Sequence, residues 1–118
     1  MSKQTPPCVL IVEDDALLRT CTILHLKGDG LDVLEAEDAE QALERLRDHP
    51  EVTTVFSDIN MPGRFDGLAL VTKIAKLRPS VRLILTSGRA KPAGMPEGVR
   101  FLAKPYRSDF LTDLIRAA

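Results

Sequence analysis

Five short apolar runs, alternating with segments of helical periodicity, constrain the fold of this chain more than any other feature. The run Cys8–Val12 is continuously apolar, which is typical of a central strand covered on both faces. The remaining runs span residues 31–36, 52–57, 81–86 and 99–103. Strands that alternate with helices predict a parallel sheet with right-handed crossovers and helices on both of its faces.

Four segments carry apolar residues at helical spacing and are predicted to cover this sheet. Asp38 followed by Gln41 forms a capping-box pattern, and Ser108 with Asp109 is expected to cap the last helix. The apolar residues that share a helix face are, in chain order, Leu17, Cys21 and Leu24; Ala39, Ala42, Leu43 and Leu46; Leu70, Ile74 and Leu77; and Leu111, Leu114 and Ile115. We expect each of these faces to pack inward.

One link between strands departs from the alternation. Residues 88–98 read Gly-Arg-Ala-Lys-Pro-Ala-Gly-Met-Pro-Glu-Gly, with two prolines and three glycines. Proline removes a helical hydrogen bond, and glycine costs a helix about 1 kcal/mol relative to alanine. We therefore expect an α/β fold with a doubly wound, parallel, five-stranded sheet in which the helix between strands 4 and 5 is shortened or absent.

The composition indicates one small globular domain. The chain has 118 residues, and its net charge of −1 comes without any basic block, so we expect no direct DNA binding. No apolar run is long enough to cross a membrane. Residues 1–7 are expected to be a lead-in without the apolar core of a signal peptide, and residues 8–118 the domain. Cys8 and Cys21 are interpreted as reduced core residues, which indicates a cytoplasmic protein.

Asp58 stands where a buried strand ends and the chain breaks at Pro62-Gly63. A single aspartate in such a place is often only a cap or turn residue. In open α/β sheets, however, ligands bind at the carboxyl ends of the strands, and those ends meet at one edge. The other residues that follow predicted strands, and so are expected beside Asp58, are Glu13, Asp14, Asp15, Thr86 and Lys104.

These residue types suit phosphoryl chemistry at an oxygen-rich cation site. Clustered carboxylates repel one another unless a cation such as Mg²⁺ shares the site, and the start of a helix accounts only for Asp15. Asp58 could act as the nucleophile toward a phosphoryl donor. Lys104 would supply positive charge, and the Thr86 hydroxyl could hydrogen-bond a phosphoryl oxygen. Taken singly, each residue has an ordinary structural interpretation; the combination favours the site.

The chain resembles the receiver domain of two-component response regulators, in order, from Val9 to Ile115. The motifs that carry the resemblance are Val12-Glu13-Asp14-Asp15, Ser57-Asp58-Ile59-Asn60-Met61-Pro62, Asp66-Gly67, Thr86-Ser87 and Phe101-Leu102-Ala103-Lys104-Pro105. The resemblance implies a flavodoxin-like (βα)₅ fold. It also implies Mg²⁺-dependent phosphoryl transfer to an aspartate from a histidine kinase or a histidine phosphotransfer protein. Such a domain catalyses only its own phosphorylation and dephosphorylation and is not otherwise an enzyme.

The same resemblance suggests a role for each matching residue. Asp58 would be the phosphoacceptor, and Thr86 and Lys104 would contact the phosphoryl group. Phe101 would be the aromatic switch residue that moves inward with Thr86, although an aromatic in a last strand is also a common core residue. The metal site would comprise Asp58, Glu13, Asp14, which is the likelier direct ligand of the acidic pair, and the backbone carbonyl of Asn60.

Two features depart from the family pattern. The loop Pro62–Gly67 is longer than the commonest family loop, which should alter its approach to the site and leave the chemistry in place. The absent helix between strands 4 and 5 removes part of a face through which many receivers dimerise or bind targets. We expect residues 88–98 to form a partner-specific surface instead.

Several functions remain open at this stage. A receiver without an output module could be a diffusible regulator, a phosphate sink or shuttle, or a fragment of a hybrid kinase; the initial Met and the short C-terminus favour a stand-alone protein. A phosphatase that passes through an aspartyl phosphate is an alternative. Such phosphatases carry an Asp-x-Asp pattern whose second aspartate is the general acid, and in this chain Asn60 stands at that position. A phosphorylation-independent interaction module of the same fold is another, although all the site positions are filled.

Overall fold

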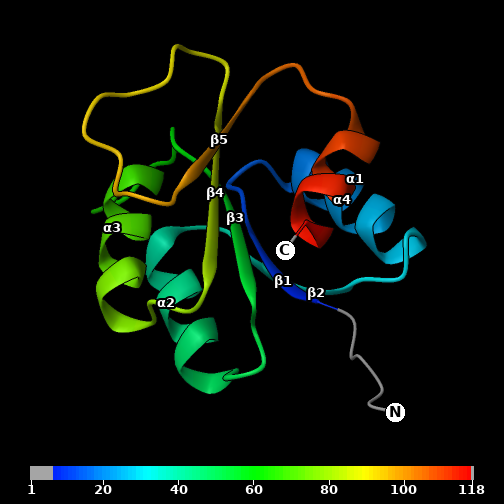
Figure 1. Ribbon diagram of the computed structural model, residues 1–118, viewed down its shortest axis with the longest axis horizontal. Helices are drawn as coiled ribbons and strands as arrows, with labels where there is room; N and C mark the ends of the chain where they lie inside the picture. The colour runs from blue at the N-terminus through cyan, green and yellow to red at the C-terminus, as the bar shows by residue number, and fades with distance from the viewer. Residues whose placement is uncertain (1–6, 118) are drawn as a thin grey trace.

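A computed structural model describes residues 7–117, and it confirms the doubly wound α/β fold. Five parallel strands form one sheet in the order β2-β1-β3-β4-β5 (Figure 1). The strands are β1 (Cys8–Val12), β2 (Asp32–Ala36), β3 (Thr54–Asp58), β4 (Arg82–Ser87) and β5 (Arg100–Ala103). Their ends lie within two residues of the predicted ones. Residues 1–6 of the predicted lead-in lie outside the described part of the chain.

Four helices cover the sheet. Figure 1 shows α1 and α4 on one side of the sheet and α2 and α3 on the other. The helices are α1 (Ala16–Gly28), α2 (Ala39–Asp48), α3 (Gly67–Leu77) and α4 (Ser108–Arg116). No helix of the described residues is long and apolar enough to cross a membrane.

The sequence sets where three of the helices begin. The side chains of Asp15, Asp38 and Asp66 each accept hydrogen bonds from backbone N–H groups in the first turn of the helix that follows. The predicted capping box forms with one change: the Gln41 side-chain oxygen accepts a hydrogen bond from the backbone N–H of Glu37, the residue before the cap. These caps fix the points at which the chain leaves the sheet.

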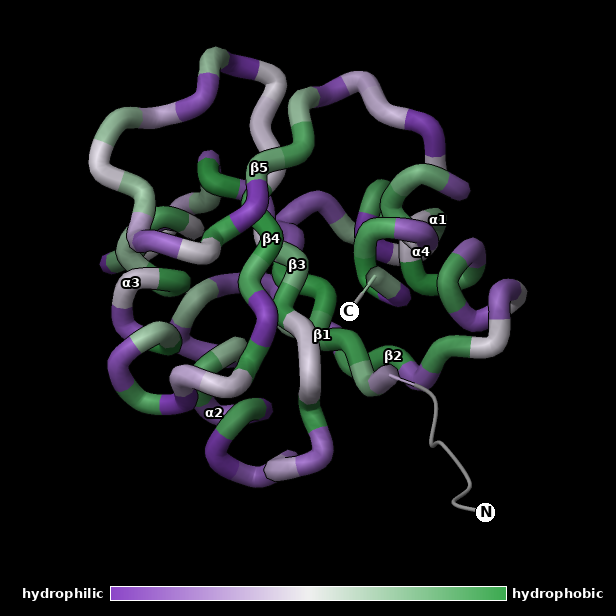
Figure 2. The backbone as a smooth tube through the Cα atoms, in the orientation of Figure 1, coloured by the Kyte–Doolittle hydropathy of each residue, from purple (hydrophilic) through white to green (hydrophobic). Residues whose placement is uncertain are grey.

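The strand β1 divides the interior into two apolar layers. Leu10 and Val12 pack into the cluster beneath α2 and α3, whereas Val9 and Ile11 pack beneath α1 and α4. All four are at most 1% exposed, because side chains alternate between the faces of a strand and both faces are covered. Figure 2 shows the hydrophobic strands at the centre of the molecule.

The prediction for the inward face of α1 is wrong. Leu17 and Leu24 are 72% and 65% exposed, and Cys21 is exposed as well. The sheet instead buries Ile23 and Leu26. The helix carries apolar residues around most of its circumference, so a helical spacing could be found on more than one face. Outside α1, Leu77 in the last turn of α3 is also exposed, contrary to expectation.

The predicted cap of the last helix is also wrong. Ser108 is already helical, the N-cap position is occupied by Arg107, and no side chain caps the helix. Asp109 lies in the first turn, where its carboxylate pairs with Arg107 at 3.1 Å. A carboxylate there still suits the positive end of the helix dipole.

The segment between β4 and β5 has no helix among its described residues, as predicted. It forms turns, with Gly94 and Gly98 at positive φ values of 79° and 87° that side chains other than glycine rarely adopt. Met95 and Val99 pack against the core cluster, whereas most of the segment is exposed. Figure 1 shows it as a wide arc above α3.

Candidate functional site at the carboxyl edge of the sheet

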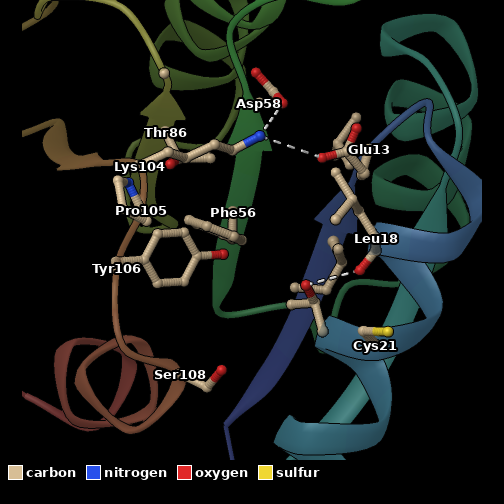
Figure 3. Close-up of a pocket in the computed structure, with 14 residues that line it drawn as sticks. Glu13, Leu18, Cys21, Phe56, Asp58, Thr86, Lys104, Pro105, Tyr106 and Ser108 are labelled. Atoms are coloured by element: carbon tan, nitrogen blue, oxygen red, sulfur yellow. Dashed lines mark hydrogen bonds and ion pairs between the residues drawn. The ribbon is translucent and has the colours of Figure 1, made fainter.

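The carboxyl ends of four strands bring the candidate residues together. Asp58 ends β3 and is paired in register with Thr86 of β4, while Glu13 follows β1 and Lys104 follows β5. Figure 3 shows these side chains around the mouth of one pocket. The pocket has a volume of about 540 Å³ and lies between α1 and the segment that joins β5 to α4.

An ion pair occupies the centre of this site. The Lys104 Nζ atom lies 2.6 Å from Asp58 Oδ2 and 3.8 Å from Glu13 Oε1 (Figure 3). The side chains of Asp58 and Glu13 are only 10% and 12% exposed. Partial burial disfavours the charged ammonium of Lys104, but the hydrogen bond with Asp58 and the negative charges of Asp58 and Glu13 together outweigh this and raise the Lys104 pKa above its usual value.

The Asp58 carboxylate is held by its own loop. Its Oδ1 atom accepts a hydrogen bond of 3.1 Å from the backbone N–H of Asn60, while Oδ2 accepts one from Lys104. The Ser57 hydroxyl donates to the Asp58 carbonyl oxygen at 2.9 Å. The N-terminus of α3 approaches closely, since the Gly67 N–H donates to the Ile59 carbonyl at 2.8 Å. Both carboxylate oxygens are therefore oriented before any ligand arrives.

The carboxyl group of Glu13 has a pKa far above its usual value. Burial raises its pKa to about 7, and the charge of Asp58 adds to that effect, while the Asp15 N–H and Lys104 act in the opposite direction. Arg19 fixes the backbone there, because its Nη1 atom donates to the Glu13 carbonyl oxygen at 2.7 Å. Two partly buried carboxylates thus share one lysine, which leaves negative charge that a cation would neutralise.

This perturbation predicts an unusual pH dependence of stability without Mg²⁺. The unfolded chain releases the Glu13 proton near pH 4.5, whereas the folded protein keeps it until about pH 7. The contribution of Glu13 to stability is therefore complete below pH 4.5 and is lost as the pH rises through 7. We expect Glu13→Gln to flatten this part of a urea-unfolding pH profile, and Glu44→Gln, on an exposed position of α2, to leave it unchanged. An identical profile for wild type and Glu13→Gln would contradict the prediction.

The remaining candidate metal residues lie less centrally. Asp14 is exposed beside Glu13, and Asn60 is exposed with its side-chain amide hydrogen-bonded to Ser87. Within residues 7–117, no three acidic, histidine or cysteine side chains converge into a preassembled metal cage. Mg²⁺ commonly binds through one or two carboxylates and keeps several waters, so the charge-rich Glu13 and Asp58 pair fits such an ion.

Neither of the two predicted switch residues is hydrogen-bonded to Asp58. The buried Thr86 hydroxyl donates a hydrogen bond of 2.6 Å to the Leu102 carbonyl oxygen of β5. Phe101 is half-buried and packs against the cluster beneath α2 and α3. In this arrangement Thr86 ties β4 to β5 and makes no hydrogen bond with Asp58.

Sequence reasoning missed Tyr106 in the wall of the pocket. Its ring meets Phe56 edge-on, with centroids 6.0 Å apart, and its hydroxyl points toward α1 (Figure 3). Burial raises the Tyr106 pKa above its usual value. The available signal was an aromatic residue directly after the Lys104-Pro105 strand end, beside a site already suspected.

The strand order and the acidic edge define a flavodoxin-like α/β protein with its site at the carboxyl ends of the strands. The sequence matches the family described as response regulator receiver domain over residues 9–116. The chain therefore belongs to the receiver domain family of two-component signalling.

Individual relatives agree with this assignment. The chain is 35% identical over 118 residues to the C4-dicarboxylate transport transcriptional regulatory protein DctD of Rhizobium meliloti, covering 95% of this chain and 25% of that protein. It thus spans about a quarter of the length of that relative. The receiver domain of the hybrid histidine kinase CckA superposes with a TM-score of 0.80 at 30% identity, covering 92% of this chain and 95% of the other.

A further solved structure carries ligands. The CheX–CheY–BeF3–Mg complex of Borrelia burgdorferi superposes with a TM-score of 0.82 at 25% identity. The match covers 92% of this chain and 85% of that one. That complex holds a magnesium ion, BeF3 and a second protein, CheX.

Proposed function

We propose that this chain is a phosphoacceptor that takes a phosphoryl group onto Asp58 and changes conformation to regulate a partner protein. The observation that carries the proposal is the contact between Lys104 Nζ and Asp58 Oδ2 beside the partly buried Glu13. An oriented carboxylate with a fixed cation next to it suits nucleophilic attack on an anionic phosphoryl group. The relation to receiver domains supports the same chemistry.

In the proposed transfer, a carboxylate oxygen of Asp58 attacks the phosphorus of a phosphohistidine. An O–P bond forms while the P–N bond breaks, and its electron pair stays on the ring nitrogen. A ring protonated at its other nitrogen then leaves as neutral imidazole. Lys104 binds the Asp58 carboxylate before transfer and the phosphoryl oxygens afterwards.

Glu13, Asp14, Asp58 and the backbone carbonyl of Asn60 would hold Mg²⁺. When bound, the ion supplies positive charge that offsets the carboxylates and the incoming phosphoryl oxygens. The magnesium-containing CheX–CheY complex of a relative supports this choice of metal.

The response to transfer would involve Thr86. A phosphoryl group adds about two negative charges, and the Thr86 hydroxyl can bond it only by leaving the Leu102 carbonyl. That exchange would loosen the tie between β4 and β5 and let Phe101 move inward. The shift in population is limited by the difference in phosphoryl contacts between the two states.

The donor we propose is a protein, either a histidine kinase or a histidine phosphotransfer protein. The relation to the receiver of the hybrid histidine kinase CckA supports it. The exposed apolar side chain of Leu18, which lines the pocket and is 49% exposed, also offers a contact for a protein donor. We also propose the cytoplasmic location that the sequence predicts.

The direct test is intact-mass analysis after incubation with Mg²⁺ and acetyl phosphate. We expect one added phosphoryl group in the wild type, and none with Asp58→Asn or with excess chelator. Asp113→Asn, at an exposed position on α4, is the matched control and should be labelled like the wild type. Labelling of Asp58→Asn would place the acceptor elsewhere.

Two other outcomes would point to the alternatives. If acetyl phosphate adds no phosphoryl group and the protein also binds no beryllofluoride, a phosphorylation-independent interaction module would be favoured. Sustained release of phosphate from a small phosphomonoester would favour a phosphatase. Neither alternative has an observation of its own in its favour.

A further inference from the structure

Ser87 joins two loops through one buried oxygen atom. The residue ends β4, next to Thr86, and is 2% exposed. Its Oγ atom accepts a hydrogen bond of 3.0 Å from the side-chain amide of Asn60 and another of 3.0 Å from the backbone N–H of Arg89. Two such bonds use both lone pairs of a hydroxyl oxygen.

The first donor belongs to the loop that orients the phosphoacceptor. The Asn60 side chain reaches from the end of β3 to β4, and the Asn60 backbone N–H donates to Asp58 Oδ1 at 3.1 Å. Anchoring the side chain therefore holds the backbone that contacts the acceptor. The Asn60 carbonyl, proposed above as a metal ligand, belongs to the same residue.

The second donor belongs to the segment that replaces the missing helix. Arg89 stands at the start of residues 88–98, most of which are exposed. Its backbone N–H would lose its acceptor if the Ser87 oxygen moved toward Asn60. The two loops are therefore held together by a single atom.

We propose that Ser87 is a positioning residue that couples the conformation of residues 88–98 to metal binding at the Asp58 site. This inference rests on the proposed function and adds a regulatory route to it. Because coupling between two sites is reciprocal, a partner that binds residues 88–98 would change the affinity for Mg²⁺, and Mg²⁺ would change the affinity for that partner. A Ser87 that only satisfied its neighbours would give no such coupling.

The test is a double-mutant cycle with Ser87→Ala and Asn60→Ala. The dissociation constant for Mg²⁺ is measured by calorimetry, and the Arg89 amide is followed by NMR in metal-free protein. Each single variant should weaken Mg²⁺ binding about fivefold, because both substitutions remove the hydrogen bond between Asn60 and Ser87, and the double variant should be no weaker than either. Ser80→Ala, an exposed serine before β4, is the matched control and should bind like the wild type.

The NMR readout separates coupling from a merely structural role. Asn60→Ala should shift the Arg89 amide resonance and speed its exchange with solvent, because the hydrogen bonds of Ser87 link Asn60 to Arg89. Asn60 is exposed, so this variant keeps the core intact. An unchanged Arg89 amide, or losses of Mg²⁺ affinity that multiply in the double variant, would overturn the inference. If the wild type binds no Mg²⁺, the proposed function fails, and the Arg89 amide alone still decides whether Ser87 couples the loops.

Discussion

Replacing Gly67 by alanine is expected to lower the free energy of unfolding by about 2–3 kcal/mol and to slow phosphoryl uptake at Asp58. A Cβ atom at this position would lie 2.1 Å from the Asp58 carbonyl oxygen and 2.8 Å from the Ile59 Cα atom. Both are backbone atoms, so no side-chain rotation can relieve the overlap. Either α3 or the end of β3 has to move.

The effect reaches the site because Gly67 begins α3 against the acceptor strand. Its N–H donates to the Ile59 carbonyl at 2.8 Å, and Asp66 caps the same helix through the Ala69 N–H. A displaced helix start would shift the loop that presents Asp58. The rate of phosphoryl uptake should therefore fall by more than the decrease in the folded fraction of Gly67→Ala can explain.

Urea unfolding and the rate of labelling by acetyl phosphate, measured on the same samples, test this prediction. Gly28→Ala is the matched control, because nothing lies within 4 Å of its added Cβ and Gly28 is helical. That variant should be as stable as the wild type or more so, by up to about 1 kcal/mol. A Gly67→Ala protein with wild-type stability would show that the contact is easily relieved.

The sequence was sufficient for the fold because its signals agreed with one another. The continuous apolar run of β1 required cover on both faces, and the glycines and prolines of residues 88–98 ruled out a helix there. Parallel strands then bring their carboxyl ends to one edge, which is why Glu13, Asp58 and Lys104 could be expected together.

The details that could not be predicted depend on contacts between distant segments. Ile23 and Leu26 are the buried face of α1, but Leu17 and Leu24 are equally apolar, and only packing against the sheet separates them. The role of Ser87 depends on the side chain of Asn60, which is 27 residues away in sequence. Spacing along the chain carries no record of such a contact.

Replacing Lys104 by methionine is expected to slow phosphoryl uptake about 100-fold. Lys104 is the only basic side chain in the described residues that pairs with the carboxylate of Asp58 or Glu13. Removing one preorganised donor from a site where negative charge develops in the transition state typically lowers the rate by a factor of about 10²–10³. Methionine keeps most of the length and the apolar stem of the side chain, so the loss would mainly reflect the charge and its hydrogen bond.

The same substitution should affect stability in a pH-dependent way that identifies its cause. Without Lys104 the charges of Glu13 and Asp58 face each other unpaired, so metal-free protein should lose more stability at pH 8 than at pH 5, where Glu13 holds its proton. Added Mg²⁺ should restore part of the loss at pH 8, because a bound cation replaces the missing charge. Lys76→Met, at an exposed position of α3, controls for removing a surface lysine. An equal loss at both pH values, with no response to Mg²⁺, would mean that Lys104 acts through packing, and the electrostatic account of the site would then fail.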